Sequence, residues 1–300
     1  MKNRIKKNSI ALAAGAAVTA VALAGCASAS PIESSESSAS TPSAGSIFEG
    51  VHGLGIDSSE DLLVASHSGI YRVDAAGELS GPLGGVPFDA MGFTVAGDQY
   101  FVSGHPSPES SAFAGPHLGL ISSADAGESW TSVSLEGTTD FHALAVSQKD
   151  PAQVYGVASD GSPLRASSDG GATWSEGASI QAYSLVADPN TSGRLFATTP
   201  EGMAVSDDAG QSFSPLADSP LLYLLAAATD VPGALVGVDV ESVVWVRAAE
   251  GEPWSERGTV EGTARAIAVG SDGERIALID DRGLVESFDG GESWTVLTAG

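Results

Sequence analysis

The sequence predicts an all-β protein, a six-bladed β-propeller over residues 47–300. Three observations predict it. An eight-residue pattern, Ser-x-Asp-x-Gly-x-Ser/Thr-aromatic, occurs four times. These copies and two weaker relatives recur about every forty residues, which is the length of a four-stranded blade. The stretches between them are short aliphatic runs without helical periodicity.

Residues 1–25 are expected to be a signal peptide that is not part of the folded domain. A basic start precedes the apolar run 9–25, which is too short and too weakly flanked for a membrane-spanning helix. The run ends in LAGC, which resembles the lipobox of bacterial lipoproteins. This resemblance implies that Cys26 becomes the lipid-carrying N-terminus, so that the protein is anchored in the cell membrane and faces outside the cytoplasm.

Residues 26–46 follow as the lipidated cysteine and a tether. The segment is rich in Ser, Ala, Pro and Glu and has a single aliphatic residue larger than alanine, Ile32. It cannot bury enough apolar surface to offset its ordering entropy, so we expect it to be disordered. Cys26 is the only cysteine, which excludes a disulfide within one chain.

The charge of the chain limits its partners. It has 13 basic and 38 acidic residues, a net charge of −25, and four of the basic residues lie in the signal peptide. So acidic a protein is not expected to bind nucleic acid. The acidity fits an exported, soluble domain and does not by itself indicate calcium.

The four complete copies of the pattern, called boxes below, lie between the third and fourth aliphatic runs of their units. They span 123–130, 167–174, 206–213 and 287–294. A decayed copy at 247–254 has Ala249 at the Asp position, and a fainter one surrounds Asp74. Six units predict six blades, with seven as the alternative if the N-terminal part hides another strand pair.

The boxes resemble the Asp-box, or bacterial neuraminidase repeat, of sialidases, sortilin-type receptors and a photosystem assembly factor. The chain is also similar to exported bacterial propellers called glycosylhydrolase-like, through HGLG at 52–55, GHP at 104–106 and the boxes. The resemblance implies that Asp and Ser bond the turn backbone while the aromatic residue packs inward, as an Asx-type turn allows. Proteins of unrelated function carry this box, so it predicts architecture and not activity. The structural residues expected from it are Asp125, Asp169, Asp208, Asp289, Trp130, Trp174, Phe213 and Trp294.

Alignment of the six units on the box places a polar or aromatic residue at the start of each first strand. The first strand of a propeller blade lines the central channel, so we expect a ring of these side chains at the channel mouth. A packed core does not require such a ring. Its members are His52, Asp89, His142, Tyr183, Tyr223 and Arg265.

A second set of polar residues is expected on the same face, in the loops between the second and third strands, while the boxes lie on the other face. It consists of His67, His105, Asp160, Asp281 and Arg282, with His117 added by an insertion at 106–117. All five histidines therefore fall in the first three blades near one face. Histidine suits transition-metal coordination, proton transfer and glycan binding. His52 and His142, at equivalent positions, are the candidate ligands for zinc or copper.

Two classes of function remain open. The first is a membrane-tethered binding or assembly module whose funnel binds a metal ion or a small glycan. The second is a glycosidase-like hydrolase, for which Asp89, Asp160 and Asp281 are the available carboxylates, or a lyase or metal-assisted hydrolase using the histidines. Sialidase activity is not expected: the resemblance implies a clasp of three arginines, and only Arg265 and Arg282 map to the funnel.

The ring is expected to close without exchange of a strand between blades. The final residues, TVLTAG, are long enough to form the last blade's own fourth strand. The first blade likewise has its own first strand at 51–57. Side-chain packing should therefore close the ring.

Overall fold

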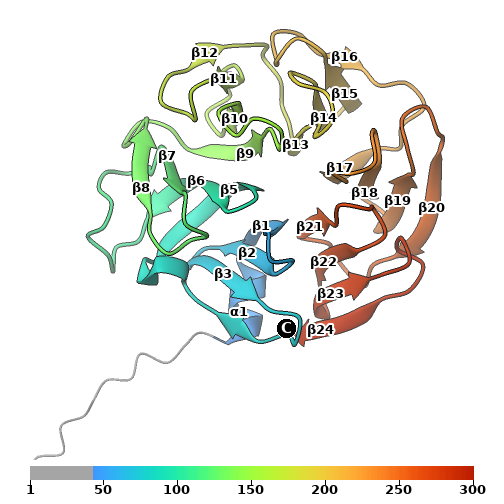
Figure 1. Cartoon of the computed structure of the whole chain (residues 1–300), viewed down its shortest axis with the longest axis horizontal. Helices are drawn as coiled ribbons and strands as arrows, with labels where there is room; N and C mark the ends of the chain where they lie inside the picture. Colours follow the sequence, from blue (N-terminus) through green and yellow to red (C-terminus); the bar gives the residue numbers. More distant parts are fainter. Residues whose placement is uncertain (1–42) are drawn as a thin grey trace, which may run out of the picture. The chain divides into compact units, whose positions relative to one another are not determined.

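The computed structural model describes residues 43–300, which form six four-stranded antiparallel sheets arranged around a centre (Figure 1). The six-bladed propeller is thus confirmed, and the seven-bladed alternative is wrong. The predicted signal peptide, Cys26 and residues 26–42 of the tether lie outside the described residues. None of the helices within 43–300 has the length and hydropathy needed to cross a bilayer.

The first three blades contain all five histidines of the chain. Blade one is built from β1 (Val51–Ile56), β2 (Leu62–Ser66), β3 (Gly69–Val73) and β4 (Leu79–Ser80). Blade two follows the short helix η1 (Leu83–Gly85) and contains β5 (Phe88–Ala96), β6 (Gln99–Pro106), β7 (Leu120–Ser123) and β8 (Thr131–Ser134). Blade three contains β9 (Phe141–Val146), β10 (Val154–Ala158), β11 (Arg165–Ser167) and β12 (Ser175–Glu176).

The last three blades repeat the same order of strands. Blade four contains β13 (Ser184–Ala187), β14 (Leu195–Thr199), β15 (Gly202–Ser206) and β16 (Ser214–Pro215). Blade five contains β17 (Leu222–Ala227), β18 (Leu235–Asp239), β19 (Val243–Arg247) and β20 (Trp254–Thr259). Blade six contains β21 (Ala266–Val269), β22 (Ile276–Asp280), β23 (Gly283–Ser287) and β24 (Thr295–Ala299).

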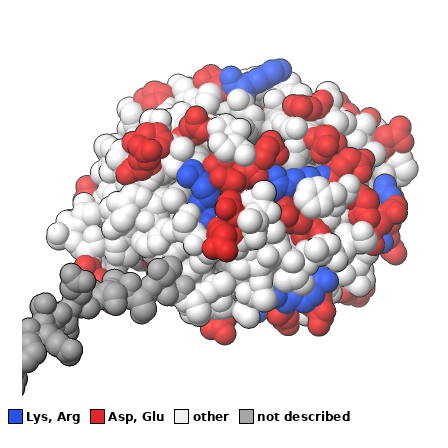
Figure 2. Space-filling view, turned by 60° about the horizontal axis from the view of Figure 1, so that its bottom comes forward, with Lys and Arg blue, Asp and Glu red and all other residues white. Residues whose placement is uncertain are grey.

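Burial changes across each blade from the second strand to the rim. The second strands β2, β10, β14 and β22 are buried at every position, because each blade packs both its faces against neighbouring blades. The outermost strands β12 and β16 are exposed at every position. Acidic side chains are spread over the molecular surface shown in Figure 2, in keeping with the net charge of −25.

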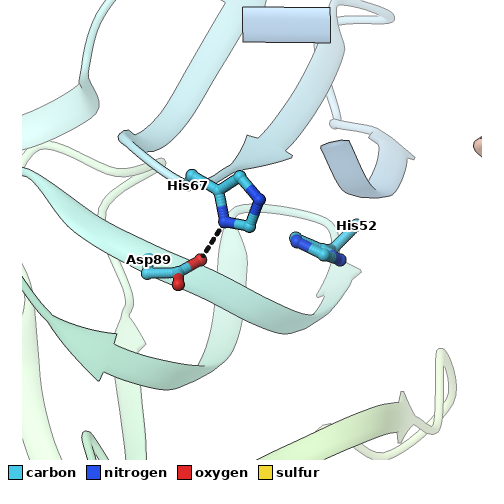
Figure 3. Close-up of side chains that lie close together, drawn as sticks. All are labelled: His52, His67 and Asp89. Atoms are coloured by element: carbon cyan, nitrogen blue, oxygen red, sulfur yellow. Dashed lines mark hydrogen bonds and ion pairs between the residues drawn. The ribbon is translucent and has the colours of Figure 1, made fainter. Parts of the chain in front are cut away.

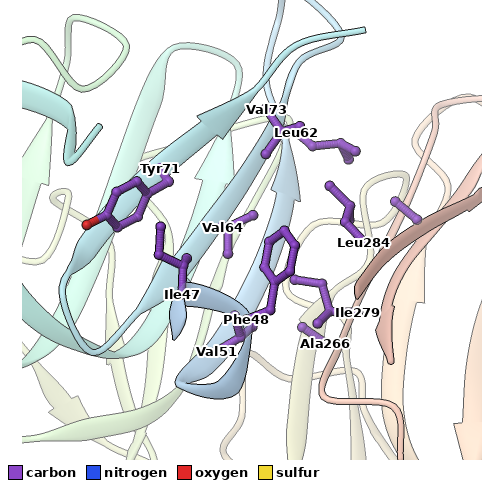
Figure 4. Close-up of a cluster of buried hydrophobic side chains, with 11 residues drawn as sticks. Ile47, Phe48, Val51, Leu62, Val64, Tyr71, Val73, Ala266, Ile279 and Leu284 are labelled. Atoms are coloured by element: carbon purple, nitrogen blue, oxygen red, sulfur yellow. The ribbon is translucent and has the colours of Figure 1, made fainter. Parts of the chain in front are cut away.

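The ring closes by packing, as predicted. β24 pairs with β23 within blade six, and β1 pairs with β2 within blade one. Between these blades, Ile47 and Phe48 join a buried cluster with residues of β2, β21, β22 and β23 (Figure 4). The Thr298 hydroxyl also donates to the Gly77 carbonyl at 2.9 Å across this boundary.

The helix α1 (Ala44–Glu49) that supplies Ile47 and Phe48 begins inside the segment predicted as a disordered tether. The Ser43 side chain caps it by accepting the Ser46 N–H. The helix thus overlaps the last three residues, 44–46, of the predicted tether. A helix of one and a half turns is too short to show a periodic pattern in sequence.

The four boxes form identical turns between the third and fourth strands of their blades. In the box of blade three, Asp169 Oδ1 accepts the N–H of Thr173 at 2.8 Å, and its Oδ2 accepts the Thr173 hydroxyl at 2.6 Å. The Ser167 hydroxyl donates to Asp169 and accepts the N–H of Gly171 at 2.8 Å. The same bonds recur at Asp125, Asp208 and Asp289.

The aromatic residues of the boxes are half-buried, and the indole N–H groups of two of them donate to residues that precede their own blade in the chain. Trp130 Nε1 donates to the Leu83 carbonyl at 3.1 Å and Trp174 Nε1 to the Ser134 hydroxyl at 2.9 Å. Phe213 and Trp294 pack against hydrophobic clusters that their own blades share with the preceding blades. The box is thus a structural element that fixes the turn and joins neighbouring blades.

Replacement of Asp169 by asparagine is expected to lower stability in a pH-dependent way. Donation from Thr173, then from Ser167, lowers the pKa of Asp169 from 3.8 to about 2. The ionised carboxylate therefore stabilises the fold above about pH 3.8, and this contribution is lost as the pH falls toward 2. Denaturant unfolding at pH 7, 4 and 3 should show a difference between wild type and Asp169→Asn that shrinks with the pH. Glu252→Gln, whose carboxylate has no bonded partner within residues 43–300, is the control; a difference independent of pH would contradict the account.

Candidate functional site

The first strands of all six blades surround a central cavity of about 380 Å³. His52, His142, Tyr183 and Arg265 line it, as the alignment on the box predicted. Asp89 and Tyr223 do not. β5 is bulged between Ala90 and Gly92, as β1 is at His52 and β9 is at His142, so that Met91 holds the position equivalent to those histidines and Asp89 lies two residues before it. Phe93 to Val95 are the residues of β5 that line the cavity. The Tyr223 hydroxyl is held aside by donation to the Ala264 carbonyl at 2.8 Å.

Three side chains gather at the edge of blades one and two (Figure 3). His67 lies in the turn between β2 and β3, and its Nδ1 is 2.8 Å from Asp89 Oδ1. The ring of His52, on β1, stands edge-on to His67 with centroids 4.6 Å apart. Desolvation and the neighbouring His67 both lower the pKa of His52. We call His52, His67 and Asp89 the outer triad; one donor atom from each lies within 4.8 Å of the others.

A second group lies between blades two and three, and we call it the inner triad. It consists of His105 at the end of β6, His117 in the insertion, and Asp140 directly before β9, again with donor atoms within 4.8 Å of one another. His105 Nε2 is 3.6 Å from Asp140 Oδ2, and the rings of His105 and His117 are 5.3 Å apart. Asp140 is only 6% exposed.

Asp140 connects the inner triad to His142. Its Oδ2 lies 2.8 Å from His142 Nε2 and accepts the Ser159 hydroxyl at 3.3 Å. Burial pushes the pKa of Asp140 upward, but the bond with His142 and the charges of His142 and His105 outweigh this and lower it. The same bond raises the pKa of His142.

Asp89 joins the two triads. Its Oδ1 faces His67, and its Oδ2 is 3.6 Å from His105 Nδ1. All five histidines of the chain and the carboxylates of Asp89 and Asp140 therefore form one network of contacts. We call these seven residues the histidine cluster. Sequence reasoning placed the histidines on one face but missed Asp140, although it directly precedes the predicted Phe141-His142 strand start.

The remaining predicted residues lie elsewhere on the same face. Asp160 is exposed in the turn after β10, where the N–H and hydroxyl of Ser162 lower its pKa. Asp281 pairs with Arg265 at 3.1 Å. Arg282 pairs with the buried Asp280 at 2.6 Å, a contact within one turn that stabilises the blade. Neither triad found within residues 43–300 includes any of them.

Two atoms of the inner triad are buried without a hydrogen-bond partner among residues 43–300. They are Asp140 Oδ1 and His117 Nδ1. A buried carboxylate oxygen left unpaired costs about 1–3 kcal/mol or more, so such atoms call for an explanation. Imidazole nitrogens with a carboxylate oxygen are a donor set that zinc and copper accept, and a bound ion would satisfy both atoms. The two candidate ligands named from sequence do not share a triad: His52 belongs to the outer triad, whereas His142 contacts Asp140.

No protein-family model and no curated protein matches the chain. Its fold is nevertheless similar to known propellers. A GH74 enzyme of Niastella koreensis matches with a TM-score of 0.59 and 16% identity over 82% of this chain and 45% of the enzyme. PorZ, a bacterial surface component of the type-IX secretion system of Porphyromonas gingivalis, matches at 0.52 and 15% over 82% and 32%.

A chain of a nidogen/laminin complex matches with a TM-score of 0.59 and 12% identity, over 79% of this chain and 92% of its own length. The present chain spans less than half the length of the GH74 enzyme and of PorZ. At such identities the likeness shows the propeller fold alone.

Proposed function

We propose that this protein is an extracytoplasmic propeller, tethered by a lipid on Cys26, that binds a transition-metal ion at the histidine cluster in a non-catalytic role. The observation that carries the proposal is the gathering of five histidines and two aspartates into one network, in which a buried oxygen of Asp140 has no partner within residues 43–300. Within each triad the donor atoms lie within 4.8 Å of one another, a spacing that suits a single ion. The tether rests on the LAGC motif in the sequence.

The imidazole and carboxylate donors determine which metal ions the cluster prefers. Imidazole favours zinc, copper or nickel, whereas calcium and magnesium prefer sites made wholly of oxygen atoms. Each triad offers two imidazoles and one carboxylate. We therefore expect zinc or copper, and no tight binding of calcium despite the acidic surface.

A glycosidase-like role is the alternative, and one feature favours a glycan. Tyr183 is 60% exposed beside the central cavity, where its ring is free to stack on a sugar. The carboxylates are less suitable. Asp160 has a lowered pKa, the reverse of what a general acid needs, and Asp281 is engaged by Arg265.

Calorimetric titration of the full chain tests the proposal. The Cys26→Ser variant is used, because a free thiol also binds zinc. We expect saturable binding of Zn²⁺ or Cu²⁺ and none of Ca²⁺ or Mg²⁺. The triple variant His52→Ala/His105→Ala/His142→Ala should lose it, while Arg265→Ala/Asp281→Ala on the same face should keep it. Absence of binding by both transition metals, or release of sugars from oligosaccharides by the wild type, would overturn the proposal.

A further inference from the structure

We infer that the inner triad is the resident metal site, with His105 Nε2, His117 Nδ1 and Asp140 Oδ1 as its ligands, and that the insertion of blade two completes it. The inference rests on the proposed function and deepens it, because it assigns the ion to three atoms of the seven-residue cluster. Three protein ligands leave one position of a tetrahedral zinc ion for water or an incoming donor.

The unpaired atoms decide between the two triads. Asp140 is almost fully buried, and its Oδ1 has no partner within residues 43–300; the same is true of His117 Nδ1. A bound cation would satisfy both. In the outer triad, Asp89 Oδ1 already contacts His67, whose side chain is 58% exposed, and none of its three side chains has a buried atom left unpaired. Water molecules can satisfy the hydrogen-bonding atoms of that exposed triad without a bound ion.

The surroundings of the inner triad match those of a metal ligand set. A histidine that ligates a metal usually presents its other ring nitrogen to a carboxylate, which fixes its orientation. His105 Nδ1 faces Asp89 Oδ2 at 3.6 Å while its Nε2 faces Asp140. Asp140 Oδ2 is held by His142, which leaves Oδ1 for the ion. Asp89 and His142 are therefore positioning residues.

The insertion delivers the third ligand on a fixed backbone. It joins β6 to β7, where blade one has only a two-residue turn between β2 and β3. The N–H of Leu118 donates to the Gly104 carbonyl at 2.8 Å, and the His117 carbonyl accepts the N–H of Gly137 at the same distance. Leu118 is fully buried. His117 is thus held at the site by bonds on both sides.

Titration with Co²⁺ tests the assignment, because its visible absorption reports both affinity and coordination. The full chain carrying Cys26→Ser should show the intense visible absorption bands of a tetrahedral Co²⁺ complex. His117→Ala should weaken cobalt binding more than about 100-fold, and Asp89→Asn should weaken it about 10- to 100-fold with the spectrum retained. His67→Ala should weaken it by no more than about tenfold, and Asp160→Asn, outside the cluster, serves as the matched control.

The outcomes separate this inference from the proposed function. If His67→Ala and His52→Ala abolish binding while His117→Ala does not, the ion sits in the outer triad: the inference is wrong and the proposed function stands. If wild type binds none of cobalt, zinc and copper, both fall. His117 lies in a surface insertion, so its variant should keep the thermal midpoint of the wild type. Asp140→Asn keeps the size and shape of the side chain and removes its negative charge, so cobalt binding by this variant is a second test of the inner triad.

Discussion

Replacement of Phe141 by alanine is expected to lower the free energy of unfolding by about 3–5 kcal/mol. Phe141 is fully buried, and its ring packs 5.1 Å from Trp174 and against the space that Gly156 leaves open. Its N–H donates to the Ser103 hydroxyl at 2.9 Å, which joins blade three to blade two. The cavity left by the missing ring would lie at the junction of the two blades.

The same change should impair metal binding, because Phe141 lies between Asp140 and His142 in the chain. Denaturant unfolding followed by zinc titration of the folded variant measures both effects. Phe288→Ala is the matched control: Phe288 is 67% exposed and contacts the Arg275 guanidinium at 5.9 Å, so we expect a loss below about 1 kcal/mol. If both variants lost the same free energy of unfolding, the packing described for blade three would be contradicted.

Replacement of Gly104 by alanine is expected to cost about 3 kcal/mol or more, from strain and overpacking together. Gly104 has φ of +143°, a region that only glycine adopts freely. A Cβ at this position would lie 2.0 Å from the Asp89 carbonyl oxygen and 2.8 Å from Met91 N. β5 and β6 would have to separate at the point where they position Asp89 and His105.

Gly97→Ala is the matched control for this change. Gly97 also has a positive φ, +58°, but a Cβ there meets no atom within 4 Å. We expect it to cost about 1 kcal/mol and to leave metal binding unchanged. Thermal unfolding and zinc titration of the two variants provide the comparison. The account fails if Gly104→Ala binds zinc as tightly as Gly97→Ala does.

The architecture could be predicted because each box encodes its own turn. Asp169 and Ser167 make their bonds within seven residues of sequence, so the pattern that specifies the turn is visible as a repeat. The spacing of the boxes then determined the number of blades. The helix α1 was missed because it depends on a single cap at Ser43 and on packing against blade six. No local sequence pattern indicates such long-range contacts.

The site was less predictable, for a physical reason. Histidines at strand starts and loop tips could be placed on one face, but which of them meet depends on bulges and on the path of the insertion. His52 and His142 stand at the bulges of β1 and β9, whereas Asp89 lies two residues before the bulge of β5 and contacts His67 and His105. Asp281 and Arg282, expected from sequence among the funnel residues, are engaged in ion pairs with Arg265 and Asp280. Sequence spacing does not say which acid pairs with which base.

Metal content tests the central claim most directly. The full-length chain with Cys26→Ser would be purified without added metal and analysed by mass spectrometry beside His105→Ala/His117→Ala. The account predicts close to one equivalent of zinc or copper per chain, lost in the double variant. A Cys26→Ser chain that holds no transition metal, even after loading with both ions and removal of the excess, would contradict it.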